Sequence, residues 1–229
     1  MKLLALDTAM EACSVALLTG ETLLTRYEEP GRGHAELILP MVDAVLREGA
    51  LGLRDLDGLA VGRGPGAFTG VRIAISVAQG LAFGAGLKIV PVSDLAALAQ
   101  RGAREAGTVL ACSDARMGEV YWAEFGVDAD GLVKASTPER LSGPEEVRVS
   151  ANGRWTAVGR GWAAYPQLKA RLNDPADRPA AVHDSFLPRA EEIVRLAVRD
   201  WHQGGAVAPE EALPVYLRDR VTHNLSQKT

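Results

Sequence analysis

The 229-residue sequence has few of the features that mark secreted, membrane-spanning or metal-binding proteins. Its two cysteines, Cys13 and Cys112, lie in separate apolar runs and form neither a Cys-x-x-Cys pair nor a metal-ligand spacing. We therefore interpret both as buried, reduced thiols. No apolar run approaches the ~18 residues that can span a bilayer. The N-terminus carries Asp7 early and lacks the layout of a signal peptide. These absences predict a cytoplasmic protein with no membrane contact.

The chain also lacks a net positive charge, and it has few histidines. The formal net charge is −4, which argues against a protein that grips nucleic acid mainly through its phosphates. The four histidines are His34, His183, His202 and His223. None has a partner four residues away on a helix, so we expect no metal site. No serine or cysteine has sequence support as a nucleophile with a neighbouring base. We expect His34 to begin the first helix and to face solvent or a partner.

The most distinctive stretch is the glycine-rich segment 62–72. An apolar run at 56–61 precedes it, and a helical pattern rich in small residues follows at 71–83. The loop and the helix start comprise Gly64, Pro65, Gly66, Phe68, Thr69 and Gly70. Thr69 is predicted to cap the helix. Two interpretations stay open. The helix start could hold an anion, or the loop could be a rigid turn that aims the helix at a partner.

The order of elements predicts two related halves. In the first half we expect strands at 2–8, 12–18, 21–29, 56–61 and 87–92, and helices at 34–47, 71–83 and 94–101. Pro40 should kink the first of these helices or mark a new start. The pattern restarts near residue 107, with strands at 108–113, 119–127, 132–135 and 155–158, and helices at 162–172 and 188–201. Asp7 and Asp114 each end the first strand of a half, which indicates a duplicated domain.

This α/β order resembles the actin-like ATPase fold, which is ribonuclease H-like and has two lobes with mixed β-sheets flanked by helices. We predict an N-terminal lobe at 1–104, a reduced C-terminal lobe at 105–220 and a polar tail at 221–229. In that fold the first turn of each lobe faces nucleotide phosphate.

That resemblance suggests a vestigial nucleotide cleft lined by Asp7, Thr8, Asp114 and Arg116. The turn after Asp7 has no glycine among its first residues and is therefore poorly suited to phosphate. Arg116, in the turn after Asp114, is a better candidate for an anion contact than the residues that follow Asp7. The alternative is that each aspartate only ends a strand and caps a turn. We expect no cofactor beyond weak residual nucleotide binding.

Five segments, in the right order, look like signatures of the TsaB family. They are residues 4–8, 64–73, 91–95, 114–121 and 216–218. The resemblance covers nearly the whole chain, with Ala67 as one departure, since serine is more usual there. It implies a non-catalytic scaffold subunit of the bacterial machinery that makes tRNA threonylcarbamoyladenosine. Its partners would be the catalytic paralogue TsaD and the ATPase TsaE, or a second copy of itself, with tRNA touched at most indirectly.

The resemblance also implies where partners bind. TsaD holds its metal through a His-x-x-x-His pair, and the matching segment here, 92–97, has no histidine. The partner interface would use the first two helices, with candidates His34, Leu37, Ile38, Met41, Arg72, Ile75, Ser76 and Gln79. Ile75→Glu or Val77→Glu would then break pairing. Burial of the second helix within its own domain is the alternative. Two other functions stay open: an actin-fold ATP-dependent kinase and a glycoprotease-like metalloenzyme.

Overall fold

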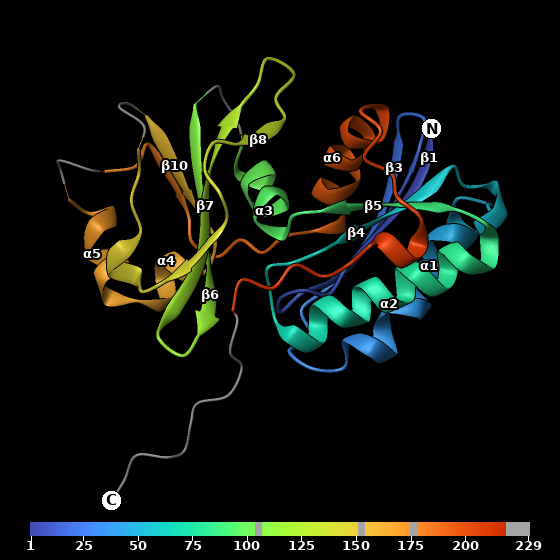
Figure 1. Ribbon diagram of the computed structural model, residues 1–229, viewed down its shortest axis with the longest axis horizontal. Coiled ribbons are helices and arrows are strands. Elements are labelled where there is room, and N and C mark those ends of the chain that lie inside the picture. Colours follow the sequence, from blue (N-terminus) through green and yellow to red (C-terminus); the bar gives the residue numbers. More distant parts are fainter. Residues whose placement is uncertain (104–106, 151–153, 175–177, 219–229) are drawn as a thin grey trace, which may run out of the picture.

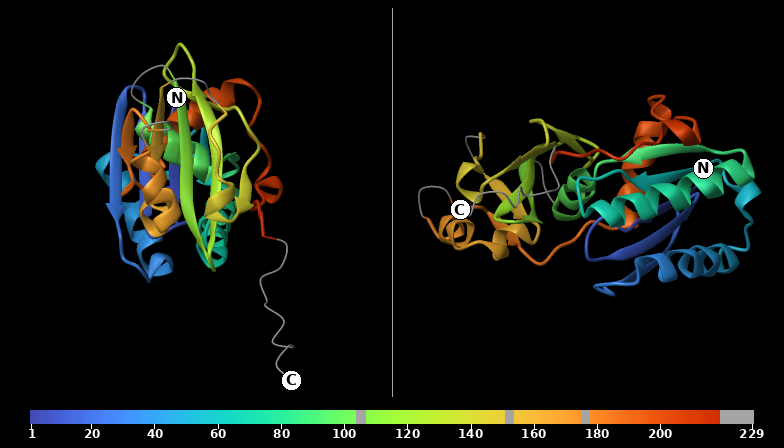
Figure 2. Two further views of the ribbon diagram at one scale, coloured as in Figure 1. Left: turned by 90° about the vertical axis from the view of Figure 1, so that its left-hand side faces the viewer. Right: turned by 60° about the horizontal axis from the view of Figure 1, so that its bottom comes forward.

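A computed structural model describes residues 1–103, 107–150, 154–174 and 178–218. It has two lobes side by side, each built around a β-sheet, and Figure 2 shows them at opposite ends of the molecule. Both sheets mix parallel and antiparallel pairs and carry helices, so the predicted fold class is confirmed. The predicted tail at 221–229 lies outside the described residues, as does residue 104, the last of the predicted first lobe.

The first sheet has the strand order β3-β2-β1-β4-β5. Its bounds are β1 Lys2–Asp7, β2 Cys13–Thr19, β3 Thr22–Glu28, β4 Gly58–Gly62 and β5 Lys88–Val92. β1, β2 and β3 form two antiparallel hairpins, while β4 and β5 are parallel to β1. Short turns between strands permit only antiparallel pairs, and the helical crossovers permit parallel ones. The predicted strand order along the chain is therefore confirmed here.

The second sheet has the order β11-β10-β6-β7-β8, with β9 paired to β7. Its bounds are β6 Thr108–Arg116, β7 Glu119–Val127, β8 Val133–Ala135, β9 Arg140–Ser142, β10 Trp155–Val158 and β11 Ala181–His183. The sequence did not predict β11, a three-residue edge strand. The predicted helix at 162–172 is two helices, α4 Gly161–Ala164 and α5 Pro166–Leu172. Tyr165 between them is extended because the residue before a proline avoids the helical conformation.

The long helices are α1 His34–Glu48, α2 Phe68–Ala85, α3 Asp94–Gly102 and α6 Ala190–His202. Short 3₁₀ turns lie at η1 Leu53–Asp55, η2 Pro144–Glu146 and η3 Pro209–Glu211. α1 runs as one helix through Pro40, so the predicted new start there is wrong. α2 begins three residues before its predicted start, with Ala67 at the N-cap. Thr69 lies inside the first turn, so it is not the predicted cap.

Two helices each pack on the sheet formed by the other half of the chain. α6 packs on β1, β2, β4 and β5 of the first sheet, opposite α1 and α2 (Figure 1). α3, from the first half of the chain, packs on β6, β7, β8 and β10 of the second sheet. The predicted division at residue 104 is therefore wrong for both helices. One continuous hydrophobic cluster, which includes side chains of both sheets, α3 and α6, joins the two lobes.

Candidate functional site

Two buried carboxyls lie beneath the glycine-rich loop. Asp7, at the end of β1, and Asp94, at the start of α3, have no exposed surface. A Cβ on Gly62 would lie 2.8 Å from Asp7 Oδ1 and 3.1 Å from Asp94 Cγ, so the two carboxyls converge on this glycine. Asp7 Oδ1 accepts from Ala9 N at 2.7 Å, and Asp94 Oδ2 accepts from Gly64 N. The pair thus fixes the β1–β2 turn and the glycine-rich loop to each other.

Burial sets the protonation of this pair. It raises the pKa of Asp7 to about 6, although several hydrogen bonds and His34 act in the opposite direction. Burial, followed by the charge of Asp7, also raises the pKa of Asp94 well above its usual range. Two carboxyls this close in a buried site do not both ionise readily. We interpret the pair as a structural link that keeps a proton near neutral pH.

The residue after Asp7 is also structural. Thr8 is fully buried, and its Oγ1 donates to Gly70 O at 2.7 Å. The amide of Ala67 donates to Ala9 O at 2.7 Å, so the β1–β2 turn is bound to the first turn of α2. The prediction that Asp7 and Thr8 line a nucleotide cleft is therefore wrong, since both are fully buried and neither lines the pocket between the lobes.

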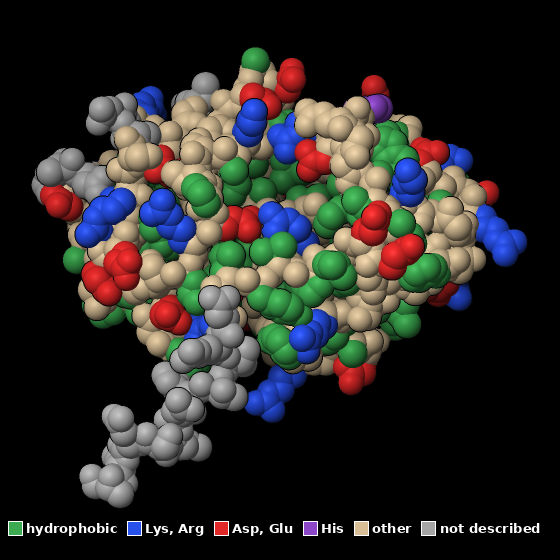
Figure 3. All heavy atoms as spheres, in the orientation of Figure 1, with side chains coloured by type: hydrophobic (Ala, Val, Ile, Leu, Met, Phe, Trp, Pro, Cys, Tyr) green, Lys and Arg blue, Asp and Glu red, His purple; other side chains and the backbone are tan. Residues whose placement is uncertain are grey.

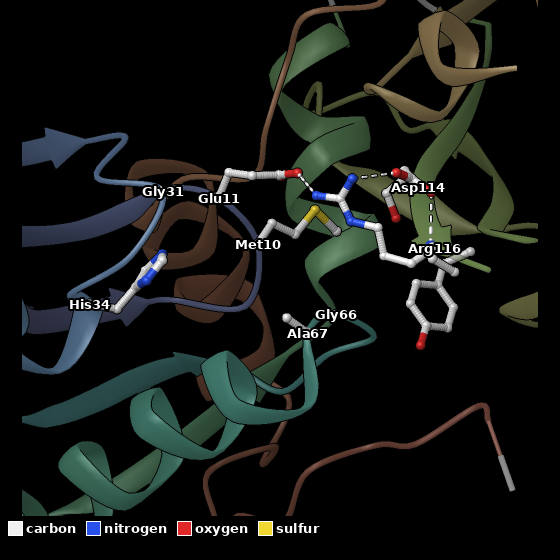
Figure 4. Close-up of a pocket in the computed structure, with 11 residues that line it drawn as sticks. Met10, Glu11, Gly31, His34, Gly66, Ala67, Asp114 and Arg116 are labelled. Carbon is white, nitrogen blue, oxygen red and sulfur yellow. Dashed lines mark hydrogen bonds and ion pairs between the residues drawn. The ribbon is translucent and has the colours of Figure 1, made fainter. Parts of the chain in front are cut away.

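A pocket does lie between the lobes, and two of the predicted cleft residues line it (Figure 4). Its volume is about 190 Å³. Its walls are Met10, Glu11, Gly31, His34, Gly66, Ala67, Ser113, Asp114, Ala115, Arg116 and Tyr121. Arg116 crosses it and pairs with Glu11 of the first lobe and Asp114 of the second, both at 2.8 Å. Arg116 is therefore an anion-binding group already occupied by two carboxylates.

A C-terminal strap, residues 213–218, runs from the first lobe to the second (Figure 1). Val215 N donates to Arg63 O at 2.8 Å, and Arg72 Nε donates to Tyr216 Oη at 2.7 Å. At the far end Arg218 donates to Ala115 O at 3.0 Å and pairs with Glu119 at 2.7 Å. The strap thus fixes the β6–β7 turn relative to the start of α2.

Arg218→Ala is expected to lower the free energy of unfolding by about 1–2 kcal/mol. The Arg218 side chain is 15% exposed, so its bond to a carbonyl is largely shielded from water. Urea denaturation will measure the change. Arg195→Ala is the matched control, because Arg195 pairs with Glu191 on the exposed face of α6. That pair should contribute under about 0.5 kcal/mol, and equal losses in both variants would contradict a clamping role for Arg218.

The exposed side of α2 has large apolar residues near its two ends and small residues along its length. Phe68 and Phe83 are 43% and 61% exposed at its two ends. Ser76, Gly80 and Gly84 on the same helix are all exposed and spaced four residues apart. We call these three residues the outer stripe of α2. Figure 3 shows hydrophobic side chains exposed around the start of this helix.

A shallow groove of about 460 Å³ lies on the same side of the molecule. Ala35 of α1 contributes to it, together with Phe68, Thr69, Arg72, Ile73, Ser76 and Val77 of α2. The groove therefore combines both helices of the predicted partner interface, and it continues directly into the outer stripe.

Comparison with known proteins gives one consistent result. The family model of TsaD, tRNA N6-adenosine threonylcarbamoyltransferase, matches residues 27–198. The tRNA threonylcarbamoyladenosine biosynthesis protein TsaB of Escherichia coli K12 is 45% identical over 96% of both chains. The TsaB protein of Haemophilus influenzae is 40% identical over 97% of this chain and 95% of its own.

The chain belongs to the TsaB family. The solved structure of YeaZ from Pseudomonas aeruginosa agrees, with 46% identity, a TM-score of 0.87, and coverage of 94% of this chain and 99% of that one. Membership of the TsaB family gives the chain a role in tRNA threonylcarbamoyladenosine biosynthesis. Both the predicted family and its two-lobed fold are confirmed.

Three of the interface residues that the TsaB resemblance implied are core residues. Ile38, Met41 and Ile75 are 0%, 6% and 4% exposed, because they pack between their helices and the first sheet. Their assignment to a partner surface is wrong. Ile75→Glu would bury a charge inside the lobe and unfold it, whereas Val77 is only half-buried.

The other candidates differ in what they can offer a partner. Arg72 and Ser76 are exposed, and Arg72 lies 3.5 Å over the ring of Phe68. His34 and Leu37 are half-buried. Gln79 is also half-buried, and its amide donates to Pro209 O and Ala212 O at 3.0 and 3.2 Å. Gln79 therefore holds η3 against α2 in this TsaB-family structure, a role its position in the sequence did not show.

Sequence reasoning also missed several residues that shape the site of this TsaB-family protein. Asp94 and Ser113 become buried groups beside the loop and the pocket, and Arg218 becomes a clamp. Asp94 had a local signal, since it follows the helix-capping Ser93. Asp94 and Arg218 also lie in two of the segments that carry the family resemblance, 91–95 and 216–218. Within the described residues, no group of three or more histidine, cysteine, aspartate or glutamate side chains could hold a metal.

Proposed function

We propose that this chain is a non-catalytic scaffold subunit in the synthesis of tRNA threonylcarbamoyladenosine. Its partner would be a TsaD-type catalytic paralogue, joined by a TsaE-type ATPase, and it would pair with itself when alone. It would work in the cytoplasm and touch tRNA at most indirectly. The partner would bind the face formed by α1 and α2.

The observation that carries this proposal is the outer stripe of α2. A Cβ on Gly80 or Gly84 would meet nothing within 4 Å, so the fold itself does not require glycine at either position. Glycine in a helix interior costs about 0.5–1 kcal/mol relative to alanine. A second helix packed closely against these backbones would explain why no side chain stands there.

The composition of α2 supports the same interpretation. Phe68–Ala85 is long and apolar enough to cross a membrane by length and composition alone, which corrects the expectation that no stretch approaches that length, yet only 33% of it is buried. Ala74, Ala78 and Ala82 form its buried side against the first sheet. A helix that is apolar on its outer side as well is suited to a shared interface.

Gly80→Leu and Gly84→Leu are expected to weaken pairing at least about tenfold, which corresponds to 1.4 kcal/mol. The monomer should be as stable as wild type or up to about 1 kcal/mol more stable, because leucine is the better helix former. Sedimentation and co-purification with the TsaD-type paralogue will measure pairing, and urea denaturation will measure stability.

Gln167→Leu on α5 is the matched control, since it adds an exposed leucine to a helix of the other lobe. It should leave pairing unchanged. Pairing that persists in both glycine variants would remove the α2 face from the interface and with it the main support for the proposal.

The interlobe geometry supports the non-catalytic part of the proposal. The pocket volume of about 190 Å³ is below the roughly 300 Å³ of typical ligand pockets, and Asp7 is sealed beneath the loop. We therefore expect no turnover of magnesium–ATP by the purified chain. Calorimetry that detects tight binding together with hydrolysis would favour the actin-fold kinase instead. A stoichiometric metal in the purified protein would favour the metalloenzyme.

A further inference from the structure

Two helices begin at the interlobe pocket without side-chain caps. Gly33 stands at the N-cap of α1 and Ala67 at that of α2, and neither N-cap carries a side-chain hydrogen bond. α3 differs, because Ser93 accepts from Ala96 N at its start. The first amides of any helix have no acceptor within the helix and carry partial positive charge. Gly31, His34 and Ala67 all line the pocket, so both uncapped ends lie at its wall.

Two buried polar atoms at this pocket also lack hydrogen-bond partners among the described residues. They are His34 Nε2 and Ser113 Oγ. Ser113 is only 3% exposed, yet it contributes to the pocket lining from β6. A buried hydroxyl without a partner is costly, on the order of 1–3 kcal/mol. Both atoms can donate a hydrogen bond to a bound group.

The two carboxylates of the pocket, Glu11 and Asp114, share the single guanidinium of Arg116. Asp114 accepts from Arg116 N and from Tyr165 Oη at 2.8 Å, in addition to its ion pair with Arg116. Among the described residues Glu11 pairs only with Arg116, across the pocket, and the Arg116 side chain is 70% exposed. An exposed pair of this kind is weak, so an incoming anion can replace Glu11 on the guanidinium.

We propose that this pocket binds a small oxyanion, of the phosphate or short-chain carboxylate class. Its oxygens would accept from the first amides of α1 and α2, from His34 Nε2, from Ser113 Oγ and from Arg116. The volume of about 190 Å³ equals the share of roughly six water molecules in liquid water. That space suits an ion or a molecule of a few heavy atoms. Because the ligand would touch both lobes, it would also hold them together.

Isothermal titration calorimetry on the full chain tests this site with inorganic phosphate and with acetate, at ionic strength held constant by sodium chloride. We expect saturable one-to-one binding in the millimolar range, and the tighter of the two anions identifies the class. Ser113→Ala should weaken binding at least about tenfold, since it removes one bond to a charged group. The same variant should raise the melting temperature of the free protein by a few degrees, because it removes the unpartnered hydroxyl.

Glu11→Gln should tighten binding several-fold, since it removes the group that competes for Arg116. Ser185→Ala is the control, because Ser185 is exposed and lies outside the pocket. The proposal would be overturned if the wild-type protein showed no saturable heat of anion binding. It would also be overturned if Ser113→Ala bound the anion with wild-type affinity. Glu11→Gln with weaker binding would also overturn it, because a site for cations would behave in that way. None of these results depends on whether α2 binds a partner.

Discussion

Gly70→Ala is expected to lower the free energy of unfolding by about 3 kcal/mol or more. Gly70 lies in the first turn of α2, where alanine would be the better helix former, so only space can make the change unfavourable. A Cβ there would lie below 3.0 Å from Thr8 O and 3.2 Å from its carbonyl carbon. Both are backbone atoms of a fully buried residue and have no room to move. Urea denaturation will measure the loss.

Gly80→Ala is the control in the same helix. Its Cβ would meet nothing within 4 Å, so it should raise the free energy of unfolding by about 0.5–1 kcal/mol. Both variants add one methyl group to a glycine of α2, and they differ only in the atoms that surround it. A loss below about 1 kcal/mol in Gly70→Ala would mean that the β1–β2 turn and the start of α2 are not rigidly bound.

Asp94→Asn is expected to raise the free energy of unfolding at pH 8, and to do so more than at pH 5. The folded state keeps protons on Asp7 and Asp94 that the unfolded chain releases above pH 3.8. The stability that Asp7 contributes is therefore full below pH 3.8 and falls as the pH rises to about 6, its raised pKa. Asp94, whose pKa burial raises well above its usual range, contributes with the same sign. An asparagine can still accept from Gly64 N and can donate to Asp7, so no like charge forms.

Urea denaturation at pH 5 and pH 8 will test this expectation, with Asp94→Ala as the comparison. Alanine leaves Gly64 N without its acceptor and leaves Asp7 unpaired, so Asp94→Ala should lose about 3 kcal/mol at either pH. Glu192, whose pKa burial raises to about 7, adds a pH dependence of the same sign. It remains in both variants. If Asp94→Asn and Asp94→Ala lower the free energy of unfolding equally at pH 8, then both carboxyls are ionised in the wild-type protein without destabilising it.

Local patterns predicted most of the elements. The strands of both hairpins and the helices α1, α2, α3 and α6 lie where alternation and helical spacing put them, within a few residues. These signals are local, since each comes from neighbours along one strand or helix. The edge strand β11 has only three residues, too few for a periodic pattern, and so it was missed.

The packing of elements between lobes could not be read from the sequence. α6 follows the second sheet in the chain and has an amphipathic pattern that fits either sheet, yet it packs on the first. The same limit affected the candidate site. Asp7 and Asp94 are 87 residues apart, and nothing near either of them shows that they share one buried space.

The interface prediction failed for a related reason. Periodicity finds the apolar side of a helix, and in α1 and α2 that side includes Ile38, Met41 and Ile75, which pack on their own sheet. A surface for a partner helix is better marked by residues that the fold does not need. In α2 those are Gly80 and Gly84, whose missing side chains meet open space.

Reconstituted threonylcarbamoylation of tRNA by the TsaD-type paralogue and the TsaE-type ATPase tests the central claim most directly. The reaction is run with wild-type chain, with Gly80→Leu, with Gly84→Leu and with Gln167→Leu. We predict product with wild type and Gln167→Leu, and a large loss with both glycine variants although they stay folded. Full activity with either glycine variant, or without this chain, would contradict a scaffold that acts through the outer stripe of α2.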